Sequence, residues 1–508
     1  MDIKTLIERF EKIERAAVQS ERAVQIISWD WRAMTPKAAA PGRAETIGAV
    51  SDVNFAILTS GENRKTLDAL AQPEHLAQLP PTLAARVREL KKQSDRKAAI
   101  PPALFSEFTV LQARSEAAWE QAKRQNDWPS FAPHLQNMFD YTNRFIDLWG
   151  YEGSRYNALL GFNEEGMTAE KLDALFTDLR DAIVPLIQAV RRSPVVIDDG
   201  FVNQTFPVEQ QRVMAHALLD LEGFRGDWGV LAESEHPYTT SFGRQDVRLT
   251  THYYEDMFLP AVFSTLHEGG HGIYEQNIDP ALDGTIVGCG LYSGMHESVS
   301  RFWENMVGRS LPFWRCNMAR FQQWFPRQLG GVTPEQMYAA VNKVGTSLTR
   351  IEADELTYNL HIILRYELER DVFEGRVRVR DLPDLWKQKM QDYLGLTPLD
   401  DTQGILQDIQ WSMAQFGYFP AYALGNLYNA QYTHTMKSQL DFDRLVETGD
   451  LGAILQWKRE NLYRFGATRS PEQTMLALTG EPLQAKYLIA YLQDKFRALY
   501  HIEKEAAQ

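Results

Sequence analysis

Apolar residues recur every three or four positions along most of this chain, which is the spacing of helices that bury one face. Between residues 3 and 24, Leu6, Phe10, Ile13 and Ala17 keep this spacing with charged residues between them. The same pattern predicts helices over residues 83–97, 102–124, 129–149, 169–190, 208–221, 347–372 and 483–505. Pro and Gly cluster at residues 35–42, 78–82, 193–200 and 330–334, which predicts loops. We therefore expect a mostly α fold.

A different pattern runs from Asp246 to Tyr253, where β-favouring residues alternate with polar ones. This alternation predicts a strand. Because the segment lies just upstream of a group of His and Glu residues at 267–271, we expect a small β-sheet to flank that group. None of the predicted loops is long enough to be a flexible linker, so we expect residues 1–508 to form a single domain.

The balance of charges and the number of cysteines narrow the function classes. The chain has 508 residues, a formal net charge of −14 and no clustered stripe of Lys and Arg, so nucleic acid is not an expected partner. Cys289 and Cys316 are too few for a disulfide framework and fit a reducing compartment. No run approaches the roughly 18 apolar residues of a membrane span, and the N-terminus has no signal-peptide pattern. We expect a cytoplasmic protein that does not bind membranes.

The motif that carries chemistry is LHEGGHG at residues 266–272. His267 and His271 are four positions apart, so a helix places both imidazoles on one face, where they can bind one metal ion. Apolar residues on both sides keep helical spacing, and Pro260 lies near the first turn, where its missing N–H costs little. A chance match is disfavoured, since about 0.01 such motifs are expected in a chain of this composition. Glu268, next to one ligand, is the expected general base.

The glycines at 269, 270 and 272 are costly in this helix. Each costs roughly 1 kcal/mol relative to Ala in a helix interior. We therefore expect the close approach of another backbone, or of substrate, to offset that cost.

A catalytic zinc site needs a third protein ligand and one open position. Glu297 is the expected third ligand, because it lies on a second amphipathic segment that a Gly-rich connection at residues 284–290 lets fold back on the first. The alternative is that Glu297 is a helix carboxylate paired with Arg301, four residues later. The upstream motif favours ligation.

Several motifs together resemble the M32 family of metallocarboxypeptidases, the carboxypeptidase Taq type, over nearly the whole chain. They are HPYT at 236–239, DVRLT at 246–250, HEGGH at 267–271, HESVSR at 296–301, RIEAD at 350–354, GILQDIQW at 404–411 and GYFPAYALGN at 417–426. The chain departs from the family pattern at three positions. Val299 replaces a Gln, Gln410 replaces a His, and Thr349 replaces an Ile. Because Gln410 cannot carry a proton in turnover, substrate preference or rate is expected to differ from the family's.

The resemblance implies a body of two lobes that line one deep central groove, and a homodimer. It also implies one divalent metal ion per chain, usually zinc, with cobalt or manganese as substitutes. The implied activity is the release of C-terminal amino acids from peptides that have a free C-terminus. His236, Gln407 and Asp408 belong to matching motifs, and we expect them to contact the substrate.

In the expected mechanism a metal-bound water attacks the scissile carbonyl while Glu268 takes its proton and then gives it to the leaving amine. Tyr418 or Tyr422 is expected to donate a hydrogen bond to the oxyanion, although two core tyrosines are nearly as good a reading. Arg248 and Arg350 are the candidates for binding the terminal carboxylate of the substrate, because Arg offers bidentate geometry.

Alternatives stay open at this point. Arg350 has an equally weighted structural reading, in which it pairs with Asp354 or another nearby carboxylate. The same zinc chemistry would serve an oligopeptidase or a dipeptidyl carboxypeptidase. A catalytically silent helical binding protein is a further alternative, which the intact Glu268 argues against.

Overall fold

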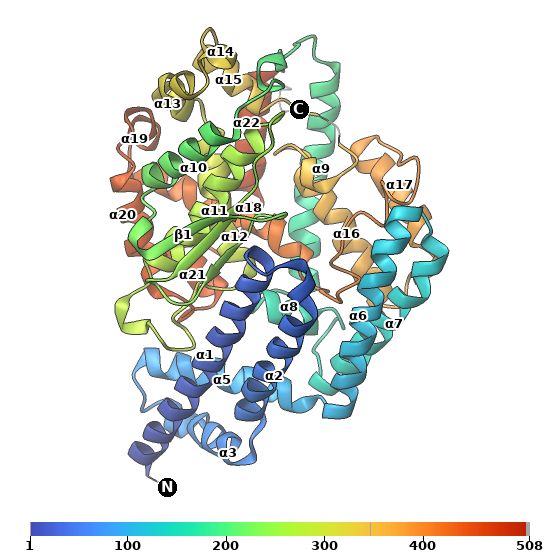
Figure 1. Ribbon diagram of the computed structural model, residues 1–508, viewed down its shortest axis with the longest axis vertical. Coiled ribbons are helices and arrows are strands. Elements are labelled where there is room, and N and C mark those ends of the chain that lie inside the picture. Colours follow the sequence, from blue (N-terminus) through green and yellow to red (C-terminus); the bar gives the residue numbers. More distant parts are fainter. Residues whose placement is uncertain (1, 346, 504–508) are drawn as a thin grey trace.

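The computed structural model describes residues 2–345 and 347–503, which form 22 α-helices and three β-strands (Figure 1). The expected mostly α fold is confirmed. The first part of the chain forms α1 (Ile3–Ala33), α2 (Ala40–Thr59), α3 (Gly61–Leu70), α4 (Pro73–Leu76), α5 (Pro81–Ala99), α6 (Pro102–Gln125), α7 (Trp128–Trp149) and α8 (Asn157–Asn163).

Helix α1 shows how the sequence determines these elements. The side chain of Asp2 accepts a hydrogen bond from the Thr5 N–H and so caps the first turn. Leu6, Phe10 and Ile13 then bury one face of the helix. They contribute to a small hydrophobic core that α1, α2, α3 and α5 share. Figure 1 shows these four helices together in the lower half of the molecule, near the N-terminus.

The middle of the chain contains the sheet and the two helices with the metal-ligating candidates. It forms α9 (Ala169–Arg192), α10 (Val208–Glu222), β1 (Gly229–Glu233), β2 (Thr239–Ser241), β3 (Val247–Thr251), α11 (Leu259–Gln276), α12 (Ser293–Arg301), α13 (Leu311–Trp324), α14 (Pro326–Leu329) and α15 (Pro334–Val341). Strand β3 is central, parallel to β1 and antiparallel to β2. Val247 and Leu249 on β3 are fully buried, and β3 packs against α11. The prediction of a strand beside the HExxH helix is confirmed.

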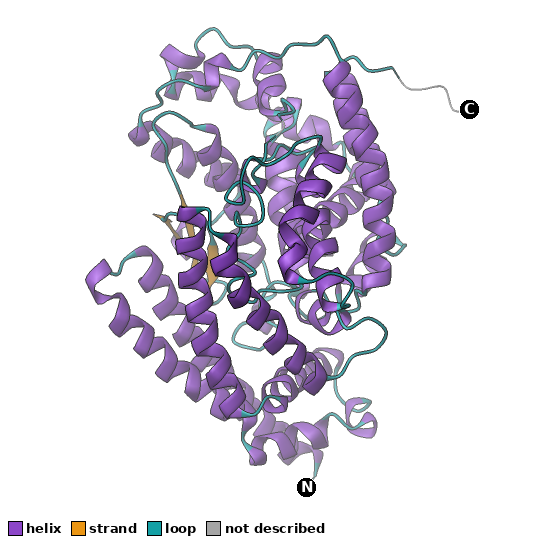
Figure 2. Ribbon diagram, turned by 90° about the vertical axis from the view of Figure 1, so that its right-hand side faces the viewer, coloured by secondary structure: helices purple, strands orange, loops and turns teal. Residues whose placement is uncertain are grey.

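The last part of the chain packs around α11 and α12 from the other side. It forms α16 (Tyr358–Phe373), α17 (Leu382–Leu394), α18 (Phe419–Gln439), α19 (Phe442–Thr448), α20 (Gly452–Asn461), α21 (Pro471–Thr479) and α22 (Lys486–Leu499). Helix α18 lies along α12 and also contacts α16 and α22. Figure 2 shows the few strands at the left-hand side of the molecule, between the helices above and below them.

Several predicted boundaries are wrong. The helix predicted over residues 483–505 spans only Lys486–Leu499, and positions 504 and 505 lie outside the described residues. The helix predicted over residues 347–372 begins only at Tyr358, because Asp354 accepts hydrogen bonds from the N–H groups of Leu356 and Thr357 and turns the chain there. A short 3₁₀ turn at Arg350–Glu352 precedes it. The loop predicted at residues 35–42 is shorter than expected, since α2 begins at Ala40. Proline is compatible with the first turn of a helix, so its presence there marked a helix start and not a loop.

Within the described residues, none of the helices combines the length and the apolar composition that crossing a bilayer requires. Cys289 and Cys316 are both free thiols. This agrees with the expectation that the two cysteines form no disulfide framework.

Candidate metal centre

Helices α11 and α12 pack directly against each other and hold the candidate metal ligands between them. A Cβ atom added at Gly270 would lie 2.8 Å from the Cα of Ser300 and 2.9 Å from the carbonyl oxygen of Val299, both on α12. A side chain at position 270 would therefore push the two helices apart. The expectation that a neighbouring backbone explains the glycines is confirmed here.

The other two glycines are constrained by side chains. A Cβ at Gly269 would lie 2.0 Å from a carboxylate oxygen of Glu222, and one at Gly272 would lie 2.7 Å from the ring of Phe224. Both neighbours lie at or just beyond the end of α10, which also packs on α11. These contacts hold α11 tightly between α10 and α12.

His267, His271 and Glu297 bring three potential ligand atoms within 4.8 Å of one another. The Nε2 atom of His267 lies 3.6 Å from Oε2 of Glu297, and the Nε2 atom of His271 lies 3.7 Å from the same oxygen. Two imidazole nitrogens and one carboxylate oxygen are a donor set that suits zinc and leaves an open position. The three residues therefore fit a divalent metal ion of that kind.

The second nitrogen of His267 is held by a buried carboxylate. Nδ1 of His267 lies 2.9 Å from Oε2 of Glu304, on the π-helix Phe302–Gly308 that continues α12. Arg301 donates to Glu304 and also, at 2.8 Å, to Oε1 of Glu297. Although burial opposes it, Arg301 and His267 hold the pKa of Glu304 well below its usual value. Glu304 is therefore an anion that orients His267 with Nε2 facing the site.

The second nitrogen of His271 is held by another imidazole. Nδ1 of His271 lies 2.6 Å from Nδ1 of His296, whose Nε2 lies 2.9 Å from Oε1 of Glu275. Burial and the neighbouring His296 lower the pKa of His271 well below its usual value. A neutral His271 is the form that binds a metal ion.

Changing Glu304 to Gln is expected to weaken metal binding about 10- to 100-fold, the usual effect of losing such an outer partner of a ligating His. The amide cannot supply the negative charge that fixes the orientation and basicity of His267. Competition with a chelator of known affinity measures the effect. Glu335→Gln, an exposed carboxylate that pairs with Arg315 elsewhere, is the control and should bind metal like the parent. An unchanged metal affinity of the Glu304→Gln variant would show that Glu304 does not orient His267 for metal binding.

Glu268 lies beside the ligands and is almost fully buried. Burial raises the pKa of its carboxyl above the usual value, which improves it as a proton acceptor. Its Oε2 atom accepts a hydrogen bond of 2.5 Å from the hydroxyl of Thr239, at the start of β2. The small sheet therefore orients this carboxylate.

Two cavities meet at His267 and Glu268, which line both. The first, of about 580 Å³, is also lined by His271, Tyr418 and Tyr422. The second, of about 490 Å³, is also lined by Arg350. The metal-ligating group thus lies between a cavity with tyrosine hydroxyls and a cavity with a buried cation.

Tyr418 and Tyr422 lie at the N-terminal end of α18, with their rings edge to face and the centroids 5.3 Å apart. Burial and the nearby Glu297 raise the pKa of Tyr418 to about 12, so its hydroxyl keeps its proton at neutral pH. Burial also raises the pKa of Tyr422. Both side chains are protonated hydrogen-bond donors beside the metal ligands.

Arg350 is held by Asp408 and not by Asp354. Its Nε donates to Oδ1 of Asp408 at 3.0 Å, and the other carboxylate oxygen accepts from Arg365 at 2.6 Å. Gln407 accepts from the Arg350 N–H and from Arg365. Despite burial, Arg365 and Arg350 lower the pKa of Asp408 to about 2. Gln407 and Asp408 thus contact the two arginines, and their predicted contact with substrate stays a prediction.

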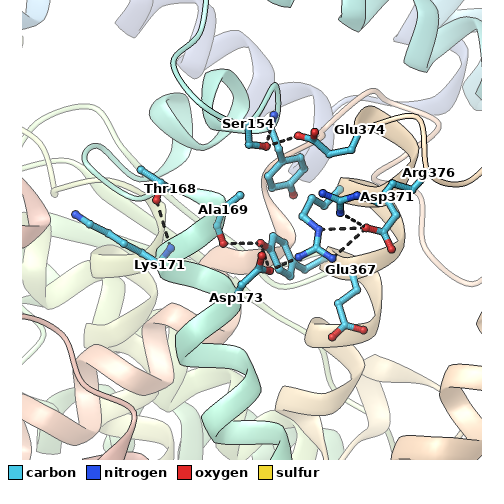
Figure 3. A network of polar contacts seen from close by, with 12 residues as sticks. Ser154, Thr168, Ala169, Lys171, Asp173, Glu367, Asp371, Glu374 and Arg376 are labelled. Carbon is cyan, nitrogen blue, oxygen red and sulfur yellow. Dashed lines mark hydrogen bonds and ion pairs between the residues drawn. The ribbon is translucent and has the colours of Figure 1, made fainter.

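Helix α16, which contains Arg365, is bound to α9 by a network of polar contacts (Figure 3). Tyr366 donates to Asp173 at 2.9 Å and to the carbonyl of Ala169 at 3.1 Å. Arg370 pairs with both Asp173 and Asp371. This network anchors α16, so Arg365 and Asp408 form a fixed base for Arg350.

His236 and Arg248 line neither of the two cavities. Arg248 donates to both carboxylate oxygens of Asp246 and lies over the rings of Trp29 and Phe242. The backbone of His236 accepts a hydrogen bond from Ser234. The proposed contacts of His236 and Arg248 with substrate stay predictions.

Sequence reasoning missed the outer partners of the ligands. Glu304 and Glu275 have a signal in the sequence, since each follows a ligand by one or two helical turns on the same face. Thr239 and Arg365 have no such spacing, because only the tertiary fold brings them to Glu268 and Asp408.

The chain is similar to known proteins over almost its entire length. Residues 9–496 match the family model described as carboxypeptidase Taq (M32) metallopeptidase. Carboxypeptidase 1 of Bacillus subtilis is 42% identical, over 97% of this chain and 98% of that protein. Thermostable carboxypeptidase 1 of Thermus thermophilus is 37% identical, over 94% and 95%. The crystal structure of the M32 carboxypeptidase from Deinococcus radiodurans has a TM-score of 0.93 at 34% identity, over 98% of this chain and 99% of that one.

Proposed function

The chain belongs to the carboxypeptidase Taq (M32) family of metallopeptidases and is a metallocarboxypeptidase, and we propose that it uses one zinc ion, with Glu268 as the general base. His267, His271 and Glu297 would hold the ion. The observation that carries the proposal is that both Nε2 atoms face one oxygen of Glu297, while the Nδ1 atoms are engaged by Glu304 and His296. Cobalt or manganese would suit a similar donor set.

When bound, the ion would supply Lewis acidity, which would lower the pKa of water and polarise the scissile carbonyl. Glu268 takes the proton of the attacking water, because its carboxylate is adjacent to His267 and burial makes it more basic than an exposed Glu. It then gives the proton to the leaving amine. Thr239 keeps one oxygen of Glu268 fixed, so the other is free to face the water.

Tyr418 and Tyr422 are the proposed donors to the oxyanion that forms at the attacked carbonyl. Both line the cavity that contains His271, and their raised pKa values keep the hydroxyl protons in place. A preorganised O–H donor stabilises negative charge better in such a buried place than in water.

Arg350 is the proposed partner of the terminal carboxylate of the peptide. It lines the second cavity, and its link to Asp408 fixes its position without using all its N–H groups. The C-terminal residue would then lie in the second cavity, and the rest of the peptide would run through the first, past the tyrosines. This arrangement selects peptides with a free C-terminus.

Three further proposals concern the whole molecule. We propose that the chain acts as a single peptidase domain whose two lobes line one groove, which agrees with cavities that meet at the metal ligands. The family resemblance supports a homodimer. Light scattering on the purified protein would test this, since a homodimer has the mass of two chains and a monomer that of one. Free cysteines support a reducing, cytoplasmic location.

Metal removal tests the function directly. The metal-free protein should release no amino acid from a blocked dipeptide or a short peptide, and one equivalent of zinc per chain should restore release. Mass spectrometry identifies the products, and the same peptide with an amidated C-terminus is the control. Release of single C-terminal residues from the peptide with a free C-terminus, and not from the amidated peptide, would support the carboxypeptidase. Internal fragments, C-terminal dipeptides or equal cleavage of the amide would contradict this specificity and favour an oligopeptidase or a dipeptidyl carboxypeptidase.

A further inference from the structure

We propose that a third cavity, outside the metal centre, binds an organic carboxylate with an apolar or aromatic body, such as a free amino acid. The cavity has a volume of about 590 Å³ and lies between α5, α7 and α8. Volumes of 300 to about 1,000 Å³ are usual for small-molecule sites. It shares no lining residue with the two cavities at the metal centre.

Arg96 on α5 is the residue on which the proposal rests. Its guanidinium group lies 3.5 Å from the ring centroid of Phe162, close over α8, and lines the cavity. Across residues 2–345 and 347–503 it forms no ion pair, and its side-chain nitrogens donate no hydrogen bond. Burial lowers its pKa, and the nearby Tyr292, Glu89 and Glu165 oppose that shift only in part. A partly buried guanidinium normally has an anionic or carbonyl partner.

A second arginine adds to this unsatisfied donor capacity. Arg64 also lines the cavity, and its buried Nε has no partner among the described residues. Its nearest carboxylate, Asp95, lies 3.7 Å away and is already bonded to Lys91 at 2.5 Å. Two guanidinium groups with free N–H donors can bind one planar oxyanion.

The cavity also has an apolar rim. Leu148 and Tyr151 are each 44% exposed and line the cavity, and Phe162, beneath Arg96, is 38% exposed. Trp149 also lines it, 4.6 Å from Phe162 between ring centroids. Exposed apolar side chains gathered around a pocket indicate a ligand-binding surface. The ligand should therefore combine an anionic head with an apolar body.

The charges around the cavity favour a carboxylate over a phosphate. Asp95 and Glu152 line it together with the two arginines, so a dianionic phosphate would meet repulsion that a single negative charge largely avoids. Glu152 also tolerates an ammonium group. A free amino acid has both groups, and a carboxypeptidase releases free amino acids.

One tyrosine, Tyr292, connects this cavity with the cavity at the metal centre. Glu165 and Tyr292 act electrostatically on Arg96, and Tyr292 bonds to Glu165 and to Lys92, one turn before Arg96 on α5. Tyr292 in turn lines the cavity that contains His271. A ligand on Arg96 would therefore contact the structure next to the active site without entering it.

The test is calorimetric titration of the metal-loaded enzyme with L-phenylalanine. We expect a binding event whose affinity falls about 10- to 100-fold in Arg96→Gln, which is the usual value of a hydrogen-bonded charge. Arg96→Lys keeps the charge but not the planar fork, so its affinity should be intermediate. Arg88→Gln, an exposed arginine on the same helix, is the matched control and should bind like the parent. Any binding at the metal centre remains in all variants.

Two probes resolve the chemistry of the head group. 2-Phenylethylamine, which lacks the carboxylate, should not bind at this site. Adenosine monophosphate offers a phosphate with an aromatic body, and its binding in place of L-phenylalanine would overturn the carboxylate assignment. Equal affinity of L-phenylalanine for the parent and Arg96→Gln would overturn the proposal entirely. Should Arg96→Gln fail to fold, Arg96→Lys decides the question in the same way.

Discussion

The Glu268→Gln variant is expected to hold one metal ion per chain and to hydrolyse peptides about a thousandfold more slowly than the parent, within the range that general bases contribute. The substitution keeps the shape of the side chain and the hydrogen bond to Thr239, but the amide cannot accept a proton. Because His267, His271 and Glu297 are unchanged, metal affinity should stay close to that of the parent. Steady-state kcat on a blocked dipeptide, together with metal analysis of the same sample, measures both quantities.

The Thr239→Val variant separates the orientation of the Glu268 carboxylate from its ability to accept a proton. It removes the hydrogen bond that orients Glu268 and keeps the carboxylate, so kcat should fall about 10- to 100-fold, the value of one hydrogen bond to a charged group. A fully metal-loaded Glu268→Gln protein with kcat within tenfold of the parent would exclude Glu268 as the base. Loss of metal from that variant would show that Glu268 helps to retain the ion.

The second large effect is expected at Arg350. In Arg350→Gln, kcat/KM for peptides with a free C-terminus should fall about 10- to 100-fold, because a charged hydrogen bond to the terminal carboxylate is lost. Folding should be retained, since Asp408 keeps its bond to Arg365. The loss should be mainly in KM if the carboxylate is bound equally in the ground and transition states.

Arg248→Gln is the matched variant, because Arg248 is the other arginine that the sequence offers for this role. It is bound to Asp246 and lines neither cavity, so kcat/KM should stay near that of the parent. The opposite outcome, with a loss in Arg248→Gln and none in Arg350→Gln, would place the substrate carboxylate at the sheet and reverse the proposed direction of the peptide.

The helices and the candidate metal ligands are predictable because they depend on local spacing. The apolar period of α1 and the i, i+4 pair His267 and His271 are both properties of a single segment. The candidate third ligand, Glu297, needed only the inference that a neighbouring helix folds back on the first. What the sequence leaves open is the identity of partners that meet from distant segments.

Arg350 illustrates that limit. Its spacing to Asp354 suggested a helical ion pair, but Asp354 accepts hydrogen bonds from the N–H groups of Leu356 and Thr357, and Arg350 lies in a 3₁₀ turn before α16. Its actual partner, Asp408, is distant in sequence and arrives through the loop before α18. Gln410 belongs to the same loop, and its buried Oε1 has no partner within the part of the chain that the structure describes. Neither the pairing of Arg350 with Asp408 nor the lack of a described partner for Oε1 of Gln410 follows from the spacing of residues along one helix.

The three glycines around His271 change how the HExxH motif of this protein should be read. The two x positions of the motif are usually taken to accept any residue. Here, however, Gly269 faces the carboxylate of Glu222, and Gly270 faces the backbone of α12. In a mutational scan these positions should tolerate almost nothing, as the ligands do, although neither offers a group to the metal. Moving the motif into another helix would therefore also require neighbouring helices that pack as closely as α10 and α12 do here. Part of what specifies the motif thus lies in the sequences of α10 and α12.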